Sequence, residues 1–418
     1  MPSLGEQIRK TIAAHRAEMR ELTKELVRIP TENPPGKNYR ECTELLARRM
    51  QELGIRTKAE EVPAANPLRA QQSSIANSEP QYWVHATFGG GNRALYFHGH
   101  YDVVPASRGG QFEPRDRNSC IFGRGAGDMK GGLVAMIFAV RALVDLKIEL
   151  RGRVELVFVP DEETGGAGGT ASLARNGLIG RSGVGMLTAE PTGGVIWNAS
   201  RGAISMRVRV KGKPAHVGLS FRGVNAFEKM MDAARAFEKE KQLVTRRRTK
   251  FRVAPEAARH SIVLIGGRSD GGTNFNAVPG ECFFTVDRRI NPEENLQLEK
   301  QRLMQVIRRL RRAGVRIEAE MIQEGESSSV AENHSFPRAL DQAVREVTGR
   351  APRFEICPGL LETRFYAARG VPALAYGPGL LSVAHGPNEF VSLREVEKCA
   401  AVYALVAAQL LGKENQSC

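Results

Sequence analysis

Short β-rich apolar runs alternate with helical stretches along much of this chain, and this alternation limits the possible folds more than any other feature. We expect strands at residues 82–88, 94–97, 154–159 and 185–189, and a helix at residues 130–146. This order predicts an α/β fold, with a mixed, mostly parallel sheet flanked by helices. Ligands of such sheets gather beyond the carboxyl ends of the strands, so polar residues at those positions are the first candidates for a site.

The pattern changes near residue 200. Strands are expected at residues 203–210, 261–265, 282–286 and 315–322, and helices at residues 225–241 and 292–312, with Pro292 at the start of the second helix. The order β-α-β-β-α-β is that of a ferredoxin-like unit. The chain then returns with a helix at 336–347, a strand at 373–376 and a last helix at 393–411. We therefore expect an inserted domain of residues 201–322 within a first domain of residues 1–200 and 323–418.

Composition excludes several classes of protein. With 42% hydrophobic and 25% charged residues, the chain has the composition of a soluble globular protein. No apolar run approaches the ~20 residues that span a bilayer. The first 20 residues mix charged and apolar side chains, as an amphipathic helix does and a secretory signal does not. The six cysteines form no Cys-x-x-Cys pair, which predicts reduced, mostly structural thiols. We expect a cytoplasmic protein without a membrane partner.

The net charge of +14 raises the question of a nucleic-acid partner. Arginines cluster at residues 308–312, on an expected helix whose other face carries Leu303, Val306 and Ile307. This pattern is typical of a solvated helix face, and no aromatic stacking platform or nucleic-acid motif accompanies it. We expect no nucleic-acid partner. A functional interpretation of the charge is that it steers anionic substrates toward a site.

Potential metal ligands lie at the ends of several apolar runs. They are two imidazoles and three carboxylates: His100, Asp128, Glu163, Glu190 and His385. This set suits a pair of divalent metals, and Glu162 lies beside it as a candidate proton carrier. Taken alone, Glu190 and His385 would each be interpreted as structural residues. The evidence for a metal site is that all five potential ligands occur in one chain. The combination is what a metal-assisted amide hydrolase needs.

The segment HGHYD follows the strand expected at residues 94–97. Residues two apart in an extended chain point the same way, so His98, His100 and Asp102 share a face. A carboxylate that accepts the second N–H of an imidazole fixes its tautomer and makes it a good ligand. We assign His100 as the ligand and Asp102 as the residue that orients it. His98 is interpreted as a hydrogen-bonded structural histidine.

The two remaining acidic motifs are GRGAGDMKGG, which contains Asp128, and PDEETGG, which contains Glu162 and Glu163. Asp128 could instead cap the following helix or belong to a phosphate-binding loop. No Gly-Lys-Ser/Thr motif follows it, which argues against a nucleotide-binding loop. We favour a carboxylate that bridges two cations. Successive residues point in different directions, so one of the two glutamates can bind metal. The other can then take a proton from the attacking water and give it to the leaving amine.

The sequence resembles a zinc metallopeptidase and amidohydrolase family. This is the family of acetylornithine deacetylase, succinyl-diaminopimelate desuccinylase, aminoacylase-1 and carboxypeptidase G. The resemblance runs almost end to end. It begins with RIPTENPPG at residues 28–36 and includes the metal-ligand segments named above. It continues with GKPAH at 212–216, NAVP at 276–279 and DRR at 287–289. Motifs of this length and order are specific, and the family has an inserted ferredoxin-like unit as its lid and dimerisation domain.

The resemblance implies roles for individual residues. His100 and Glu190 would complete one metal position, Glu163 and His385 the other, and Asp128 would bridge them, with zinc as the expected metal. Cobalt and manganese also suit such nitrogen and oxygen ligands. Glu162 would be the general base. His216 resembles a lid histidine that stabilises the oxyanion in a neighbouring subunit, which implies a homodimer through the lid. Asn276 would lie near it, and Arg289 and Arg364 would hold a substrate carboxylate. For Arg289 a salt bridge within the lid is an equal alternative.

Two positions depart from the family pattern. The segment after His216 lacks the family's usual proline, and Glu362 stands two residues before Arg364, where an aspartate is usual. Both concern substrate rather than metal. We predict a hydrolase that deacylates an N-acyl amino acid or a small peptide bearing a free carboxylate. The alternatives are an exopeptidase (a carboxypeptidase or dipeptidase), a hydrolytic deaminase of an aromatic or other unusual amine, and a non-catalytic binding protein on the same fold.

Overall fold

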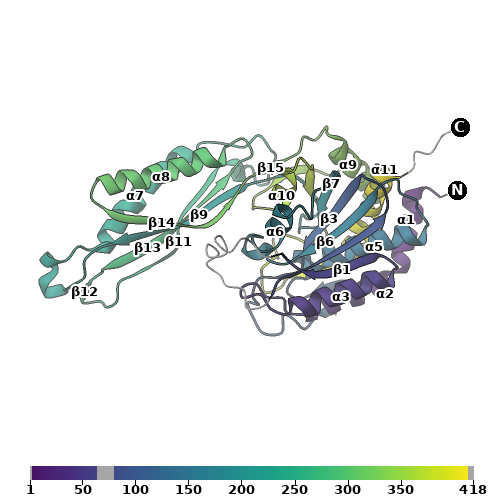
Figure 1. Ribbon diagram of the computed structural model, residues 1–418, viewed down its shortest axis with the longest axis horizontal. Coiled ribbons are helices and arrows are strands. Elements are labelled where there is room, and N and C mark those ends of the chain that lie inside the picture. The colour runs from purple at the N-terminus through teal and green to yellow at the C-terminus, as the bar shows by residue number, and fades with distance from the viewer. Residues whose placement is uncertain (1, 64–79, 413–418) are drawn as a thin grey trace. The chain divides into compact units, whose positions relative to one another are not determined.

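The computed structural model describes residues 2–63 and 80–412, which form two compact units (Figure 1). The first unit comprises Met1–Asn198, Ser329–Phe354 and Phe365–Cys418, and the second comprises Ala199–Ser328 and Glu355–Arg364. Each is described by itself below.

The first unit is built on a nine-stranded mixed sheet. Its order is β1 (Arg56–Glu61), β2 (Tyr82–Gly89), β6 (Arg153–Val159), β3 (Ala94–His100), β7 (Gly183–Thr188), β17 (Ala373–Ala375), β8 (Ile196–Ser200) and β15 (Ser328–Ser329), with β16 (Phe354–Cys357) paired to β8. The four strands β6, β3, β7 and β17 are parallel. His100 pairs with Val159, so the segments that follow β3 and β6 leave the sheet at the same edge. The predicted α/β class and mixed sheet are confirmed.

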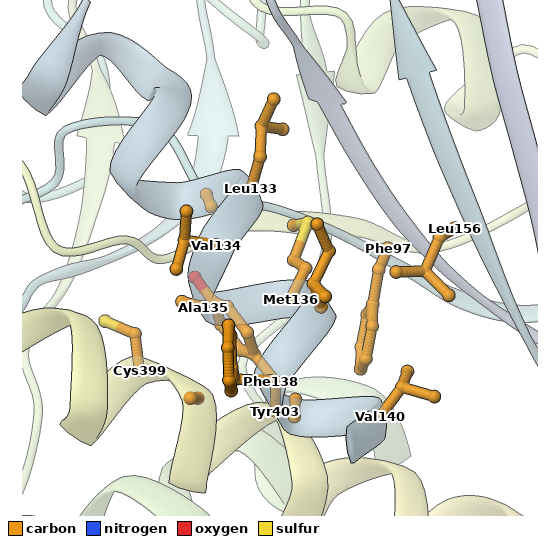
Figure 2. Packing of buried hydrophobic residues seen from close by; sticks show 14 of the residues in the cluster. Phe97, Leu133, Val134, Ala135, Met136, Phe138, Val140, Leu156, Cys399 and Tyr403 are labelled. Atoms are coloured by element: carbon orange, nitrogen blue, oxygen red, sulfur yellow. The ribbon is translucent and has the colours of Figure 1, made fainter. Parts of the chain in front are cut away.

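Helices bury both faces of this sheet. One face carries α1 (Leu4–Ala14), α2 (Arg16–Arg28), α3 (Tyr39–Glu52), α5 (Gly131–Asp145), α9 (Ser335–Thr348) and α11 (Leu393–Leu411), and the other carries the short α6 (Thr170–Arg175) and Tyr366 of α10 (Thr363–Ala367). All seven residues of β3 are buried, as expected for a parallel strand covered on both sides. Figure 2 shows Phe97 of β3 and Tyr403 of α11 around the apolar side chains of α5. The N-terminal helix predicted as one element is two, because the chain bends at His15.

A small antiparallel sheet fixes two loops at the edge of the first unit. It contains β18 (Phe390–Ser392), β5 (Cys120–Phe122) and β4 (Arg115–Arg117), with Phe390 paired to Phe122. This pairing brings the segment after His385 alongside the segment before Asp128, although more than 250 positions separate them. The loops that carry two potential ligands are therefore joined through backbone hydrogen bonds.

The second unit has the predicted β-α-β-β-α-β order. Its elements are β9 (Gly202–Lys211), α7 (Ala226–Val244), β11 (Ile262–Gly271), β13 (Glu281–Ile290), α8 (Leu296–Arg312) and β14 (Arg316–Gly325), and its antiparallel sheet has the order β11-β13-β9-β14. The prediction that Pro292 starts the second helix is wrong. Asn295 caps α8, its side-chain oxygen accepting from the N–H of Leu298 at 3.0 Å, and the turn before it is closed by Glu294 and Asn291. Arg308, Arg309 and Arg312 are exposed on α8, as a solvated helix face requires.

The cysteines and the apolar helices bear on two further predictions, the state of the thiols and the membrane. The five cysteines that the structure describes are free thiols, and Cys418 lies outside the described residues. Among the described helices, none combines the length and the apolar character that crossing a bilayer demands.

Candidate metal centre

Two groups of potential ligands lie where the parallel strands end, and they share one residue. The first group is His100, Asp128 and Glu190, and the second is Asp128, Glu163 and His385; in each group the ligand atoms lie within 4.8 Å of one another. Nε2 of His100 is 3.3 Å from Oδ1 of Asp128, and Nε2 of His385 is 3.3 Å from its Oδ2. Asp128 therefore presents one carboxylate oxygen to each histidine, which is how a bridging ligand is arranged.

Buried polar atoms in these groups lack the partners that burial requires. Among the described residues, Nε2 of His100, Oδ1 of Asp128 and Oε1 of Glu163 are buried without a hydrogen-bond partner. Such atoms are rare in folded proteins because they lose water without compensation. A divalent cation supplies the missing partner, and imidazoles with carboxylates form a donor set that zinc, cobalt and manganese accept. The residues present fit a bound metal.

Asp102 lies at the centre of the network behind His100. Nδ1 of His100 is 3.0 Å from the backbone oxygen of Asp102 and 3.5 Å from its Oδ1, so the backbone is the closer partner. The buried carboxylate of Asp102 accepts hydrogen bonds from the backbone N–H groups of Glu162 at 3.2 Å and Glu163 at 3.1 Å. It also accepts from Nδ2 of Asn33 at 2.9 Å. Asp102 thus joins the loop after β3 to the turn that carries both glutamates.

The two adjacent glutamates lie in different surroundings. They open the short turn η2 (Glu162–Thr164), which follows Asp161 with its left-handed backbone (φ 75°). Oε2 of Glu163 is 3.3 Å from Nε2 of His385, and the Glu163 side chain is only 5% exposed. Glu162 is half-buried and belongs to neither ligand group among the described residues. Glu163 therefore lies against a histidine of a ligand group, and Glu162 lies next to it in the chain.

The carboxylates of the site favour added positive charge. Hydrogen bonds to Asp128 and Glu163, with their charges, raise the pKa of His385 to about 10. Burial lowers the pKa of His100, but the neighbouring carboxylates of Asp102 and Asp128 outweigh it and hold that pKa well above its usual value. Burial also raises the pKa of Glu163. A divalent cation competes with these protons, because metal ligands bind in their deprotonated forms.

His98 has a separate structural role. Its ring is 1% exposed, with the hydroxyl of Tyr366 3.1 Å from Nδ1 and the hydroxyl of Thr170 3.3 Å from Nε2. Both ring nitrogens are engaged on the face of the sheet that α6 covers. The interpretation of His98 as a hydrogen-bonded structural histidine is confirmed.

The other candidate residues belong to the second unit, which contributes to neither ligand group. His216 and Asn276 lie together: β10 (Ala215–His216) pairs with β12 (Ala277–Val278), and the N–H of Val217 donates to the backbone oxygen of Asn276 at 3.0 Å. Arg289 makes an ion pair with Asp287, at 2.8 Å between Nε and Oδ1. Arg364 is 7% exposed and donates from Nη1 to the backbone oxygen of Leu361 at 2.7 Å.

Sequence reasoning gave no role to three buried residues that support the site. Asn33 donates to Asp102, and Arg124 pairs with Glu389 beside the loops of Asp128 and His385. All three lie inside motifs that contributed to the resemblance. A usable signal was the presence of opposite charges, four residues before Asp128 and four after His385, in loops rich in glycine and proline. Buried charges need partners, so such a pair points to a contact.

A mixed sheet whose parallel strands end at two histidine–carboxylate groups with one shared aspartate fits a metal-dependent hydrolase. The chain matches the family model described as Peptidase family M20/M25/M40 over residues 96–409, and it belongs to that family. The suspected family is confirmed.

Solved structures with the same fold include peptidases from several organisms. Human carnosine dipeptidase 1 is 19% identical, with a TM-score of 0.75 over 98% of this chain and 100% of that one. The di-peptidase Dug1p from Saccharomyces cerevisiae is 16% identical, with a TM-score of 0.77 over 98% and 99%. The Bacillus subtilis YXEP protein, described as a dinuclear metal binding peptidase, is 16% identical, with a TM-score of 0.65 over 96% and 99%.

Proposed function

We propose that this protein is a dinuclear metal-dependent hydrolase of amide bonds. On this proposal it deacylates an N-acyl amino acid or a small peptide that bears a free carboxylate. The observation that carries the proposal is Asp128, whose two oxygens face two different histidines at 3.3 Å each. His100 and Glu190 would hold one ion, and Glu163 and His385 the other. A bound pair of divalent ions lowers the pKa of water and polarises the carbonyl of the substrate.

The chain's own residues would then move the proton and orient the substrate. Glu162 belongs to neither ligand group in the described part of the chain, precedes Glu163 directly, and donates its backbone N–H to Asp102. It would take the proton of the attacking water and deliver it to the leaving nitrogen. His216 would stabilise the negative oxygen as it forms, with Asn276 beside it. Arg364 and Arg289 would bind the substrate carboxylate, although the ion pair of Arg289 with Asp287 suits a structural role equally.

A second candidate function is that of a dipeptidase. It is favoured by the similarity in fold to human carnosine dipeptidase 1 and to the dipeptidase Dug1p. Both reactions break an amide bond with the same groups, so the substrate panel has to include both classes. We would assay N-acyl amino acids, dipeptides and aromatic amines with the zinc, cobalt and manganese forms. Turnover only of dipeptides favours the second candidate, and ammonia release from an aromatic amine would contradict both.

Glu162→Gln tests the assignment of the general base. The substitution removes a proton acceptor and keeps the size of the side chain, so the variant should bind as much metal as the wild type. Its kcat should fall by about 10²–10⁴, the range that a positioned acid or base contributes. Glu60→Gln, an exposed glutamate of β1, is the matched control and should keep full activity. Full activity in Glu162→Gln would refute the assignment.

We further propose that a second copy of this chain docks along β11. This strand is an edge of the four-stranded sheet, and Ile262 and Leu264 are 37% and 54% exposed on it. Phe227 and Met231 are also exposed, on the adjacent helix α7. Unpaired edges with apolar side chains favour pairing with another chain. Leu264→Glu should give monomers in sedimentation analysis. The equally exposed Leu298 of α8 provides a matched control, and Leu298→Glu should leave the dimer intact.

A further inference from the structure

One buried ion pair lies beside the metal centre and has no part in the chemistry proposed above. Nη1 of Arg124 is 2.6 Å from Oε2 of Glu389, and each side chain is 1% exposed. Burying two charges is costly, and such pairs persist only where their geometry and hydrogen bonds are favourable. The pair lies between the loop of Asp128 and the loop of His385, and it contacts both.

Glu389 contacts the loop of the shared ligand. Its second oxygen, Oε1, accepts from the backbone N–H of Gly127 at 3.0 Å and from that of Asp128 at 3.1 Å. A Cβ on Gly127 would lie 3.0 Å from the backbone oxygen of Phe390, so glycine permits this close approach. Two hydrogen bonds to one charged oxygen fix the backbone from which the Asp128 side chain extends.

Arg124 contacts the loop of His385. Its Nη2 donates to the backbone oxygen of His385 at 3.0 Å, and its Nη1 is 3.4 Å from that of Gly386. His385 has a left-handed backbone (φ 62°), which a residue other than glycine adopts only where its surroundings hold it. Because the side chain of His385 is 54% exposed, the packing of that side chain cannot fix its position. The buried Arg124 guanidinium therefore supports this part of the loop, together with Gln111, whose Nε2 donates to the backbone oxygen of Gly386 at 3.1 Å.

We propose that Arg124 and Glu389 are positioning residues that set the distance between Asp128 and His385. Arg124, which holds the His385 loop, thereby controls the affinity of the position formed by Asp128, Glu163 and His385. Glu389, which holds Asp128, acts on both positions because they share that ligand. The position of His100 and Glu190 has a different support, because His100 is held by Asp102. Loss of the Arg124 contact with the His385 loop should therefore weaken one ion far more than the other. This inference rests on the proposed two-metal function.

The test is a titration of the metal-free protein with Zn²⁺, measured by calorimetry and by metal content after dialysis against buffered Zn²⁺. Arg124→Lys keeps the charge near Glu389 but replaces a planar fork with a single ammonium group, which cannot reach both Glu389 and the His385 carbonyl. Glu389→Gln keeps the shape and removes the charge. In Arg124→Lys we expect one ion to bind as in the wild type and the other about 10–100-fold more weakly, as when residues that orient a ligand are lost. In Glu389→Gln we expect both ions to bind more weakly, because the backbone of their shared ligand Asp128 loses its charged acceptor.

A control variant separates positioning from general loss of stability. Arg288 is also 1% exposed and pairs with Glu294 at 2.6 Å and with Glu299 at 3.0 Å, in the second unit. Arg288→Lys should leave both zinc affinities unchanged. The inference is overturned if Arg124→Lys binds both ions like the wild type or weakens both equally, if Glu389→Gln binds both ions like the wild type, or if neither variant folds with zinc present. A wild-type protein that binds fewer than two ions would instead overturn the proposed function.

Discussion

Replacing Asp102 by Asn tests whether the network behind the site, rather than the ligands alone, sets its geometry. The carboxylate of Asp102 accepts from Glu162 N–H through Oδ1, and from Glu163 N–H and Asn33 Nδ2 through Oδ2. An asparagine amide has one oxygen, so at least one of these donors must face an NH₂ group. The orientation that loses least keeps the oxygen at the Oδ2 position and leaves the N–H of Glu162 unpaired.

The cost follows from these three hydrogen bonds. A lost hydrogen bond to a charged acceptor costs about 1.5–3 kcal/mol, and the two that remain weaken to the ~1 kcal/mol of neutral bonds. We therefore expect Asp102→Asn to lower the free energy of unfolding of the first unit by about 3–5 kcal/mol. Turnover should fall as well, because the unpaired N–H belongs to the candidate general base. Metal affinity should fall by about 10–100-fold.

Urea unfolding of the metal-free protein, followed by tryptophan fluorescence, measures this change. Both tryptophans of the chain, Trp83 and Trp197, lie in the first unit, so the signal reports on that unit. Asp116→Asn is the control, since Asp116 makes only an exposed ion pair with Arg20 at 3.2 Å. Such pairs contribute less than about 1 kcal/mol. An Asp102→Asn variant within about 1 kcal/mol of the wild type, with unchanged turnover, would show the reasoning to be wrong.

Two further predictions concern the stability of the first unit. Phe97 is 0% exposed between α5 and Tyr403 (Figure 2), so Phe97→Ala should cost about 3–5 kcal/mol in the same urea assay, and a cost below about 1 kcal/mol would contradict the packing. Burial raises the pKa of Glu155, but hydrogen bonds from His85 and Arg153 outweigh it and lower that pKa from about 4.5. A lowered pKa stabilises the fold at higher pH, and this contribution is lost as pH falls below about 4.5 through the folded value. Glu155→Gln should therefore show a shallower loss of stability with acid in unfolding at pH 3–6, and an unchanged slope would refute this.

The sequence alone determined most of the elements and the ligand types. The alternation of β-rich and helical runs gave the strands β2, β3, β6 and β7 and the helix α11 within one or two residues, except that β3 continues to His100. These features depend on the spacing of apolar residues within each segment, which can be read without knowing which distant segments pack against it. The ligand residues were identifiable because histidine and acids rarely end buried strands unless they have a partner or a function.

Only the tertiary structure shows how close the potential ligands lie to one another and which residues hold them. The resemblance implied that Glu163 and His385 share a metal position, and in the structure a turn anchored by Asp102 brings these two side chains together. Sequence reasoning had no reason to assign a role to Arg124 or Glu389, because their contact joins residues 265 positions apart. The start of α8 was also misplaced, because the cap at Asn295 outcompetes the proline at 292. Local patterns cannot encode such contacts, since strand order and packing of distant segments set the distances between side chains.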